Sequence, residues 1–333
     1  MPLNLRPAGA LPARFRRPRV LLVGCGDVGL RVAALLGARV QLIALSSSAQ
    51  RAPLLRSAGL RVLRGDLDRA DSLRRLAGLA QRVLHLAPPA AQGSQDRRTR
   101  SLVHTLRRGP RPRRLVYGST SGVYGDCAGA EVAETRRVQP QSARALRRVD
   151  AECTLRRYGR DSGVAVQLLR IPGIYAENRA NGTPRARLRQ GTPVLQAQDD
   201  VYTNHIHADD LARACVLALW RGGAQRVYNV CDNSVLKMGD YYDLAADVYG
   251  LPRPPRVSRA AMQDSVDALR QSFMQESRRL LNRRMREELG LRLRYPGVRD
   301  GLWPSPEGVL SAAASPSCDP ALTRATSSSA STQ

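Results

Sequence analysis

Short, continuous apolar runs recur along the first half of the chain and are separated by longer amphipathic stretches. The first run, VLLV at 20–23, is followed by apolar residues at helical spacing: Val28, Val32, Leu35 and Leu36. Continuous apolar runs are typical of parallel strands buried on both faces, and helical spacing behind a strand predicts a covering helix. The pattern therefore predicts an α/β fold with a doubly wound parallel sheet. Further strands are expected within 39–45, 61–68, 81–90 and 113–126, and a helix over 101–108.

The pattern changes after about residue 174, where shorter pieces punctuated by proline replace the long strand–helix alternation. Helical periodicity returns at 276–290. We expect residues 19–173 to form the sheet domain, with later strands returning to it, and residues 174–303 to form mostly a smaller C-terminal substrate lobe.

Both ends of the chain have compositions that disfavour a packed structure. Residues 1–18 are basic and lack the apolar middle of a secretory signal, so we expect either a disordered extension or residues that precede the true start codon. Residues 304–333 are rich in Ser, Ala, Thr and Pro, so burial cannot offset the entropy of ordering them. We expect a disordered tail there.

The remaining composition indicates a folded, reduced chain. Of the 333 residues 43% are hydrophobic, which is enough for a sizeable core. No apolar run approaches the roughly 18 residues that cross a bilayer, so no membrane partner is expected. The cysteines have no C-x-x-C spacing, which favours a reducing cytoplasm over a disulfide framework. They are Cys25, Cys127, Cys153, Cys215, Cys231 and Cys318.

The formal net charge of +25 raises the question of nucleic-acid binding. Of the 53 basic residues only Lys237 is a lysine, which leaves 53 − 1 = 52 arginines, and they are spread through every segment. Such one-sided use resembles codon bias more than a binding stripe, and no helix-turn-helix, zinc-finger or RNP pattern accompanies it. We expect salt-sensitive attraction to polyanions but no specific nucleic-acid partner.

A glycine-rich turn follows the first strand. It reads Gly24-Cys25-Gly26-Asp27-Val28-Gly29, with a strand before it and a helix after it. In a β-α-β dinucleotide site the first glycine makes the bend, the second lets the backbone approach the pyrophosphate, and the third lets helix and strand pack closely. The context predicts a Rossmann-type NAD or NADP site that includes Gly24, Gly26, Asp27, Val28 and Gly29.

The next strand ends predict the adenosine side of this site. An acidic residue at the end of 39–45 would favour NAD, but the chain has Ser46 there and Arg51 just beyond, which suits a 2′-phosphate and favours NADP. Asp66 either accepts from the adenine amine or caps a helix beginning near Ala70. Leu67, Leu86, Ala87 and Pro88 are the other expected contacts, because they follow the third and fourth strands.

Further motifs follow the glycine turn in order along the chain. They are STSGVYG (119–125), an acidic loop with Glu131 and Glu134, PQS (140–142), AE (151–152), LLRIPGIYAENR (168–179), TNHIHADDLA (203–212) and YPGVRDGL (295–302). In these motifs the chain resembles the short-chain dehydrogenase/reductase superfamily, in its extended, epimerase/dehydratase-like branch. The resemblance covers about residues 18–303 and implies an NAD(P)-dependent enzyme that moves a hydride to or from a carbonyl or sugar-nucleotide-like substrate. It also implies that Pro172 lies beside the nicotinamide.

The same resemblance assigns catalytic positions. Thr120 occupies the place of the Ser/Thr that holds a substrate oxygen. The family's Tyr-x-x-x-Lys pair falls on Arg144 and Arg148, and Arg148 keeps a charge that could hold ribose hydroxyls. Arg144 cannot act as an ordinary proton shuttle, because the pKa of arginine lies above about 12. The glycine spacing matches atypical members of the superfamily that lack the usual pair.

Other side chains could carry the proton instead. Tyr124 is a candidate, although packing under the coenzyme loop explains it better. Tyr175, His205 and His207 lie in segments that the resemblance places near substrate, and we expect only one of the two histidines to face the pocket. We favour His207, because imidazole titrates near neutrality.

Two further clusters allow more than one interpretation. The HIHADD segment could hold a metal, but we expect none, because Asp209-Asp210 precede an apolar helix that they could cap. Asn204, Arg179 and Asp199-Asp200 either meet an anionic substrate or lie in water.

We therefore expect an enzyme with a small-molecule substrate, and a homodimer is possible. The alternative is an NAD(P)-binding sensor or scaffold with little or no turnover.

Overall fold

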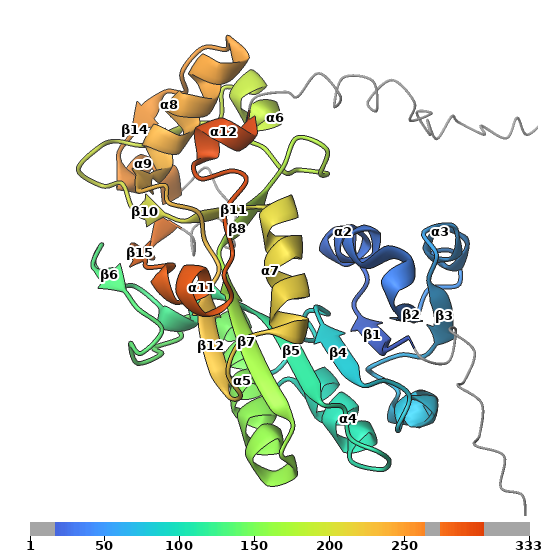
Figure 1. Ribbon diagram of the computed structural model, residues 1–333. Helices are drawn as coiled ribbons and strands as arrows, with labels where there is room; N and C mark the ends of the chain where they lie inside the picture. The colour runs from blue at the N-terminus through green and yellow to red at the C-terminus, as the bar shows by residue number, and fades with distance from the viewer. Residues whose placement is uncertain (1–16, 264–273, 303–333) are drawn as a thin grey trace, which may run out of the picture. The chain divides into compact units, whose positions relative to one another are not determined.

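The computed structural model describes residues 17–263 and 274–302 (Figure 1). The expected disordered extension over 1–18 lies outside these described residues except for Arg17 and Pro18, and the expected tail over 304–333 lies wholly outside them. The described part is built on one seven-stranded sheet with the order β12-β7-β5-β4-β1-β2-β3, and every pairing in it is parallel. Its strands are β1 (Arg19–Val23), β2 (Gln41–Ser46), β3 (Arg61–Arg64), β4 (Arg82–His85), β5 (Arg114–Thr120), β7 (Ala165–Ile171) and β12 (Arg226–Asn229).

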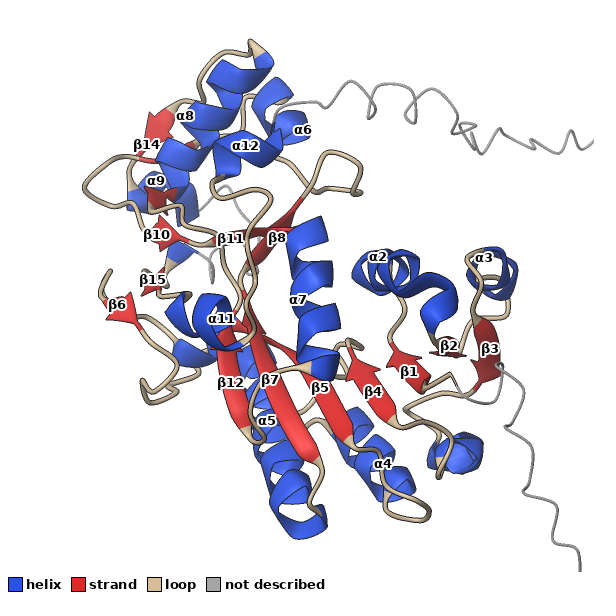
Figure 2. Cartoon of the chain, viewed as in Figure 1, coloured by secondary structure: helices blue, strands red, loops and turns tan. Residues whose placement is uncertain are grey.

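Helices cover both faces of this sheet (Figure 2), which confirms the predicted fold class. On one face α2 packs against α7, and on the other α4 packs against α5. Ser142 caps α5 by accepting from the Ala145 amide, and Asp96 caps α4 by accepting from Thr99. The covering helices are α2 (Asp27–Leu36), α3 (Ala52–Ser57), α4 (Arg97–Leu106), α5 (Ala143–Ser162) and α7 (Ala208–Trp220).

Strand β1 shows why the apolar runs are continuous. Val20 and Leu22 belong to the core on the α2/α7 face, whereas Leu21 and Val23 belong to the core on the α4/α5 face. Successive side chains of a strand point to opposite faces, so a strand covered on both sides needs apolar residues throughout. All four side chains are at most 2% exposed.

Most of the remaining elements form a C-terminal lobe beyond the carboxyl ends of the central strands (Figure 1), whereas α11 packs against β12 and buries Met285 in the core on the α2/α7 face. Two small parallel pairs lie among these elements: β8 with β11, and β6 with β15. These elements are β6 (Glu131–Val132), β8 (Gly173–Tyr175), α6 (Arg185–Arg189), β9 (Val194–Leu195), β10 (Tyr202–Thr203), β11 (His205–His207), β13 (Leu236–Lys237), α8 (Met238–Tyr249), β14 (Arg256–Val257), α9 (Arg259–Gln263), β15 (Arg279–Leu280), α11 (Arg283–Glu288) and α12 (Val298–Leu302). Within the described residues, the remaining helical elements are three 3₁₀ turns: η1 (Gly37–Arg39), η2 (Ala70–Leu76) and η3 (Ser121–Tyr124).

The expected helix over 276–290 is wrong in its first half. Residues 279–280 form β15, which pairs with β6, and the helix α11 begins only at Arg283. The pairing fixes this segment as a strand, because it is held by a partner about 150 positions earlier in the chain. Among the described residues, no helix combines the length and the apolar character that a membrane crossing needs.

Candidate functional site

The glycine turn after β1 has the geometry of a backbone cradle. Gly24 has φ +84°, and a Cβ there would lie 2.3 Å from the Ala87 backbone nitrogen, so the bend requires glycine. A Cβ on Gly26 would meet nothing within 4 Å, and a Cβ on Gly29 would lie 3.2 Å from Cys25 Sγ. The turn thus presents bare backbone at Gly26, at the start of α2, where helix amides and the helix dipole favour an anion.

A small cavity of about 310 Å³ lies against this turn. It lies at the carboxyl ends of β5 and β7, beside the first turn of α2, at the edge of the sheet where ligands of open α/β folds bind. Arg179 reaches it from the loop after β8 and donates to Asp27 Oδ2 at 2.6 Å. The lining includes the predicted coenzyme residues Gly24, Gly26, Asp27, Val28, Gly29, Leu86 and Pro172.

Of the contacts predicted from the later strand ends, Leu86 lines this cavity, whereas Ser46, Arg51, Asp66, Leu67, Ala87 and Pro88 do not. Arg51 crosses the glycine turn, where Nη2 donates to the Cys25 carbonyl at 2.9 Å. The Ser46 hydroxyl donates to the Ser48 carbonyl at 3.1 Å. The structure therefore places a guanidinium and a hydroxyl beside the end of β2, and their coenzyme roles remain predictions.

The capping alternative for Asp66 is wrong. Its Oδ1 accepts from the Asp68 amide at 3.0 Å, whereas the turn η2 has Arg69 at its N-cap without a side-chain cap. Leu67 is buried, Ala87 packs under Gly24, and the Pro88 carbonyl accepts from Arg98 at 3.2 Å.

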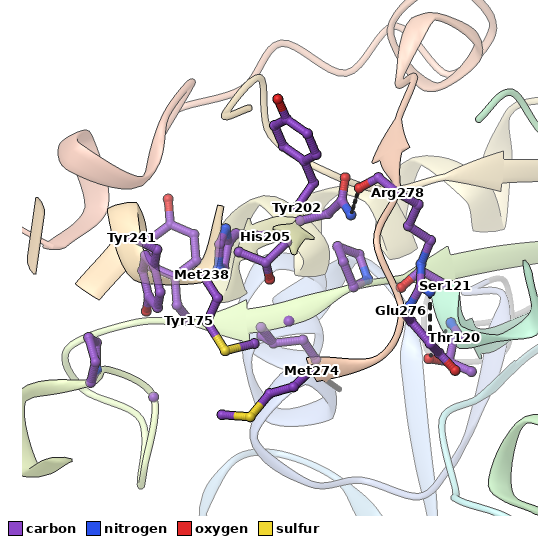
Figure 3. Close-up of a pocket in the computed structure, with 18 of the residues that line it drawn as sticks. Thr120, Ser121, Tyr175, Tyr202, His205, Met238, Tyr241, Met274, Glu276 and Arg278 are labelled. Carbon is purple, nitrogen blue, oxygen red and sulfur yellow. Dashed lines mark hydrogen bonds and ion pairs between the residues drawn. The ribbon is translucent and has the colours of Figure 1, made fainter. Parts of the chain in front are cut away.

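A large cavity of about 740 Å³ adjoins the small one and extends into the C-terminal lobe (Figure 3). Thr120 lines both cavities at the end of β5, and its Oγ1 accepts from the Gly122 amide at 3.3 Å. The residue that the sequence singled out for the substrate oxygen therefore lies where the two spaces meet. Arg148, Pro172 and Ile174 also line both.

Arg144 and Arg148, two of the arginines of α5, line the large cavity. Arg148 Nη1 donates to Tyr117 Oη at 2.9 Å and to the Gly118 carbonyl at 2.7 Å. Arg144, one helical turn earlier, lines the large cavity only. Burial lowers the pKa of the Arg144 guanidinium, the charges of Arg148 and Arg278 lower it further, and the Glu276 carboxylate opposes them.

Glu276 and Arg278 were not found by sequence reasoning. Glu276 Oε2 lies 2.7 Å from Arg278 Nη1, and each side chain is only 9% exposed. A Cβ built on Gly122 would lie 3.8 Å from Glu276 Oε2 and 3.7 Å from Thr120 Oγ1, so this carboxylate covers the turn after Thr120. Figure 3 shows Glu276, Arg278 and Thr120 grouped at one end of the cavity. No sequence motif marks these residues.

The two histidines of β11 have exchanged the expected roles. His205 lines the large cavity, stacks on Tyr241 with ring centroids 4.3 Å apart, and has its pKa lowered to about 4 by burial. His207 lines neither cavity. Its Nδ1 accepts from the Asp209 amide at 3.2 Å and its ring stacks on Tyr295 at 3.7 Å, so it is an N-cap of α7 and a packed ring.

Tyr124 also does not reach either cavity. Its hydroxyl donates to Asn229 Oδ1 at 2.7 Å, the Arg170 guanidinium lies 4.6 Å from its ring centre, and the residue is 1% exposed. The proton-carrying role is therefore wrong, and packing explains this tyrosine. His85 is likewise a packed strand residue, with Nε2 2.9 Å from the Thr99 hydroxyl.

The polar residues of the lobe divide into two groups. Asn204 lines the large cavity, but its amide donates to the Arg278 carbonyl and its Oδ1 accepts from Leu280, so it fixes the strand that carries Arg278. Asp199 and Asp200 line neither cavity. They accept from backbone amides of the lobe, and their expected contact with substrate is wrong.

The acidic pair Asp209-Asp210 lies within the first turn of α7 and does not provide its N-cap, which is His207. Asp210 is fully buried, and its carboxylate accepts from the amides of Arg294 and Tyr295. Within residues 17–263 and 274–302, no group of three or more His, Cys, Asp or Glu residues could hold a metal ion.

Comparison with known proteins places this geometry in a family. No curated protein matches the chain. A conserved protein of unknown function from Silicibacter pomeroyi matches with a TM-score of 0.72 and 27% identity, covering 89% of this chain and 99% of that one. UDP-glucose 4-epimerase from Thermotoga maritima, solved with UDP-glucose, matches with a TM-score of 0.72 at 18% identity over the same shares.

UDP-glucuronic acid 4-epimerase from Bacillus cereus, solved with NAD, has a TM-score of 0.69 at 15% identity and covers 88% of this chain and 99% of its own. These likenesses show a common fold. The profile of the NAD dependent epimerase/dehydratase family matches residues 20–231, which include the glycine turn, Thr120, Arg144 and Arg148. The chain therefore belongs to the NAD-dependent epimerase/dehydratase family.

Proposed function

We propose that this protein binds NAD or NADP in the small cavity and transfers a hydride to or from a substrate held in the large cavity. The bare backbone at Gly26 is the observation that carries this proposal. Open space over Gly26, the tight bend at Gly24 and the close packing at Gly29 are what a pyrophosphate on a helix N-terminus requires. The residues present therefore fit the coenzyme.

The end of β2 supports NADP as the preferred coenzyme. Arg51 is fixed across the glycine turn by the hydrogen bond that its Nη2 donates to the Cys25 carbonyl. This bond takes up only one of the five N–H donors of a guanidinium group. A 2′-phosphate beside Ser46 would be met by a positive charge and a hydroxyl instead of by an acidic residue.

Three side chains can perform the chemistry around the bound coenzyme, which supplies or accepts the hydride. Thr120 lines both cavities and can hold the reacting substrate oxygen. Arg148 is anchored to Gly118 and can hold the nearby ribose. Glu276 faces the turn after Thr120, and its carboxylate can give or take the proton that the arginine at position 144 cannot.

The competing function is coenzyme binding without turnover. The observation that favours it is Arg144, which stands in the cavity at the place where the family has its acid–base tyrosine. The pKa values of Tyr175 and Tyr241 are raised by burial, and that of His205 is lowered by burial to about 4.

Calorimetric titration of the full chain with NAD⁺, NADH, NADP⁺ and NADPH tests the coenzyme step. We expect binding in the micromolar range, tighter for the phosphorylated pair. No heat with any of the four would refute the proposal. A coenzyme-linked screen of carbonyl and hydroxyl compounds then separates the two functions, because tight binding without turnover on any of them supports the competing one.

A further inference from the structure

The large cavity is strongly polarised in charge. At the end next to Thr120 it is lined by three guanidinium groups, those of Arg144, Arg148 and Arg278. Glu276 is the only carboxylate of the described lining. Three positive charges therefore face one negative charge where the substrate is expected to react.

Two of the positive groups at this end, Arg148 and Arg278, are held in place by hydrogen bonds to backbone carbonyls. Arg278 is 8% exposed and is anchored through Nη1 to the Gly125 carbonyl at 2.8 Å and to Glu276. Among the described residues, no atom accepts a hydrogen bond from the buried Nε of Arg278 or of Arg148. Like charges in a partly desolvated site repel one another, and an anion between them would relieve that repulsion.

The opposite end of the cavity has a different character. Met238 and Met274 bring their thioethers close together there, and the rings of Tyr175 and Tyr241 line the wall behind them (Figure 3). Met274 is 5% exposed and packs with Leu195. Methionine and aromatic side chains form adaptable apolar surfaces for ligands.

The fourth arginine of the lining does not change this division. Arg187 extends from α6 and donates through Nη1 to Tyr242 Oη at 2.7 Å. That bond ties its guanidinium to α8.

We propose that the substrate of this cavity is an amphipathic acid, in which a carboxylate or phosphate binds between Arg144 and Arg278 beside Thr120 and an apolar body lies against Met238 and Met274. This inference rests on the proposed function and specifies its substrate class. With the oxyanion bound, three positive and two negative charges would share this end of the cavity. The carbon that exchanges the hydride would then lie close to the acid group, because Thr120 and Arg144 line the same end.

Calorimetry of the full chain, with and without saturating coenzyme, tests the inference with four small probes. They are 3-phenylpropanoate, phenyl phosphate, methyl 3-phenylpropanoate and propanoate. We expect at least one of the two aromatic anions to bind at least ten-fold more tightly than both the uncharged ester and propanoate. The better of the two anions tells carboxylate from phosphate. Equal affinity for ester and acid, or for propanoate and the aromatic anions, would overturn the inference.

Variants locate the binding. Arg144→Met should weaken the aromatic anion at least ten-fold and leave the ester unchanged, and Met238→Gln should weaken the aromatic anion and leave propanoate unchanged. Arg157→Met, at an exposed position of the same helix, is the matched control and should change nothing. Circular dichroism checks that each variant is folded. Unchanged affinity in a folded Arg144→Met protein would refute the site.

The same titrations keep this inference separate from the proposed function. If coenzyme binds but the aromatic anions bind no more tightly than the ester and propanoate, the proposed substrate class is wrong and the coenzyme site is retained. If no coenzyme binds, the proposed function fails, while the probes without coenzyme still decide whether the cavity selects amphipathic acids.

Discussion

Replacing Gly26 with alanine should abolish coenzyme binding and leave the protein folded. Gly26 has φ −85°, which any residue can adopt, and its Cβ would meet nothing within 4 Å. Loss of a glycine from the unfolded chain gains about 0.4–1 kcal/mol. Alanine as an N-cap costs about as much, so the free energy of unfolding should change by less than about 1 kcal/mol.

The effect on binding should be much larger, because the added methyl group fills the space over the bare backbone. A phosphate held off this turn loses at least two charge-assisted hydrogen bonds, each worth about 1.5–3 kcal/mol. A loss of about 3 kcal/mol corresponds to a factor of about 100 or more in Kd.

Thermal or urea unfolding measures the change in the free energy of unfolding. Calorimetric titration with NADPH measures the change in Kd. Gly37→Ala is the control: Gly37 ends α2 with φ +49° and open space around it, so that variant should lose about 1–2 kcal/mol of stability and keep its coenzyme affinity. If Gly26→Ala bound coenzyme as tightly as a binding-competent wild type, the cradle would not be the pyrophosphate site.

Three further outcomes follow. Glu276→Gln should lower kcat at least 100-fold on any substrate found by the coenzyme-linked screen, since general acid–base catalysis contributes about 10²–10⁴-fold, and should leave coenzyme Kd unchanged; an unaltered kcat removes Glu276 from the mechanism. Arg51→Gln should weaken NADPH at least ten-fold and spare NADH, whereas equal losses for both would indicate a structural role. Burial raises the pKa of Asp232 to about 7, so between about pH 4 and pH 7 the folded state keeps a proton that the unfolded state releases, and the free energy of unfolding falls as pH rises. Asp232→Asn should flatten that part of the stability profile, measured by urea unfolding from pH 5 to pH 8, and an unchanged slope would contradict the assignment.

The sequence determined the parts of this protein that depend on local pattern. Continuous apolar runs specify strands covered on both faces, and β1 shows this directly, because its alternate side chains enter two different cores. The sequence also predicts the glycine turn. Gly24 is required by its positive φ and its approach to Ala87, both consequences of a strand that turns at once into a helix.

Only the tertiary structure decided which side chains meet in the cleft. Glu276 and Arg278 reach Thr120 because β15 pairs with β6. No residue type or spacing in the sequence predicts that pairing. The same holds for the histidines: His205 faces the large cavity, whereas His207 is turned to the start of α7 by the amide of Asp209. Local patterns record which backbone conformation a segment prefers. The chemistry of a cleft depends on contacts between segments far apart in the chain, which exist only after the lobe has packed on the sheet.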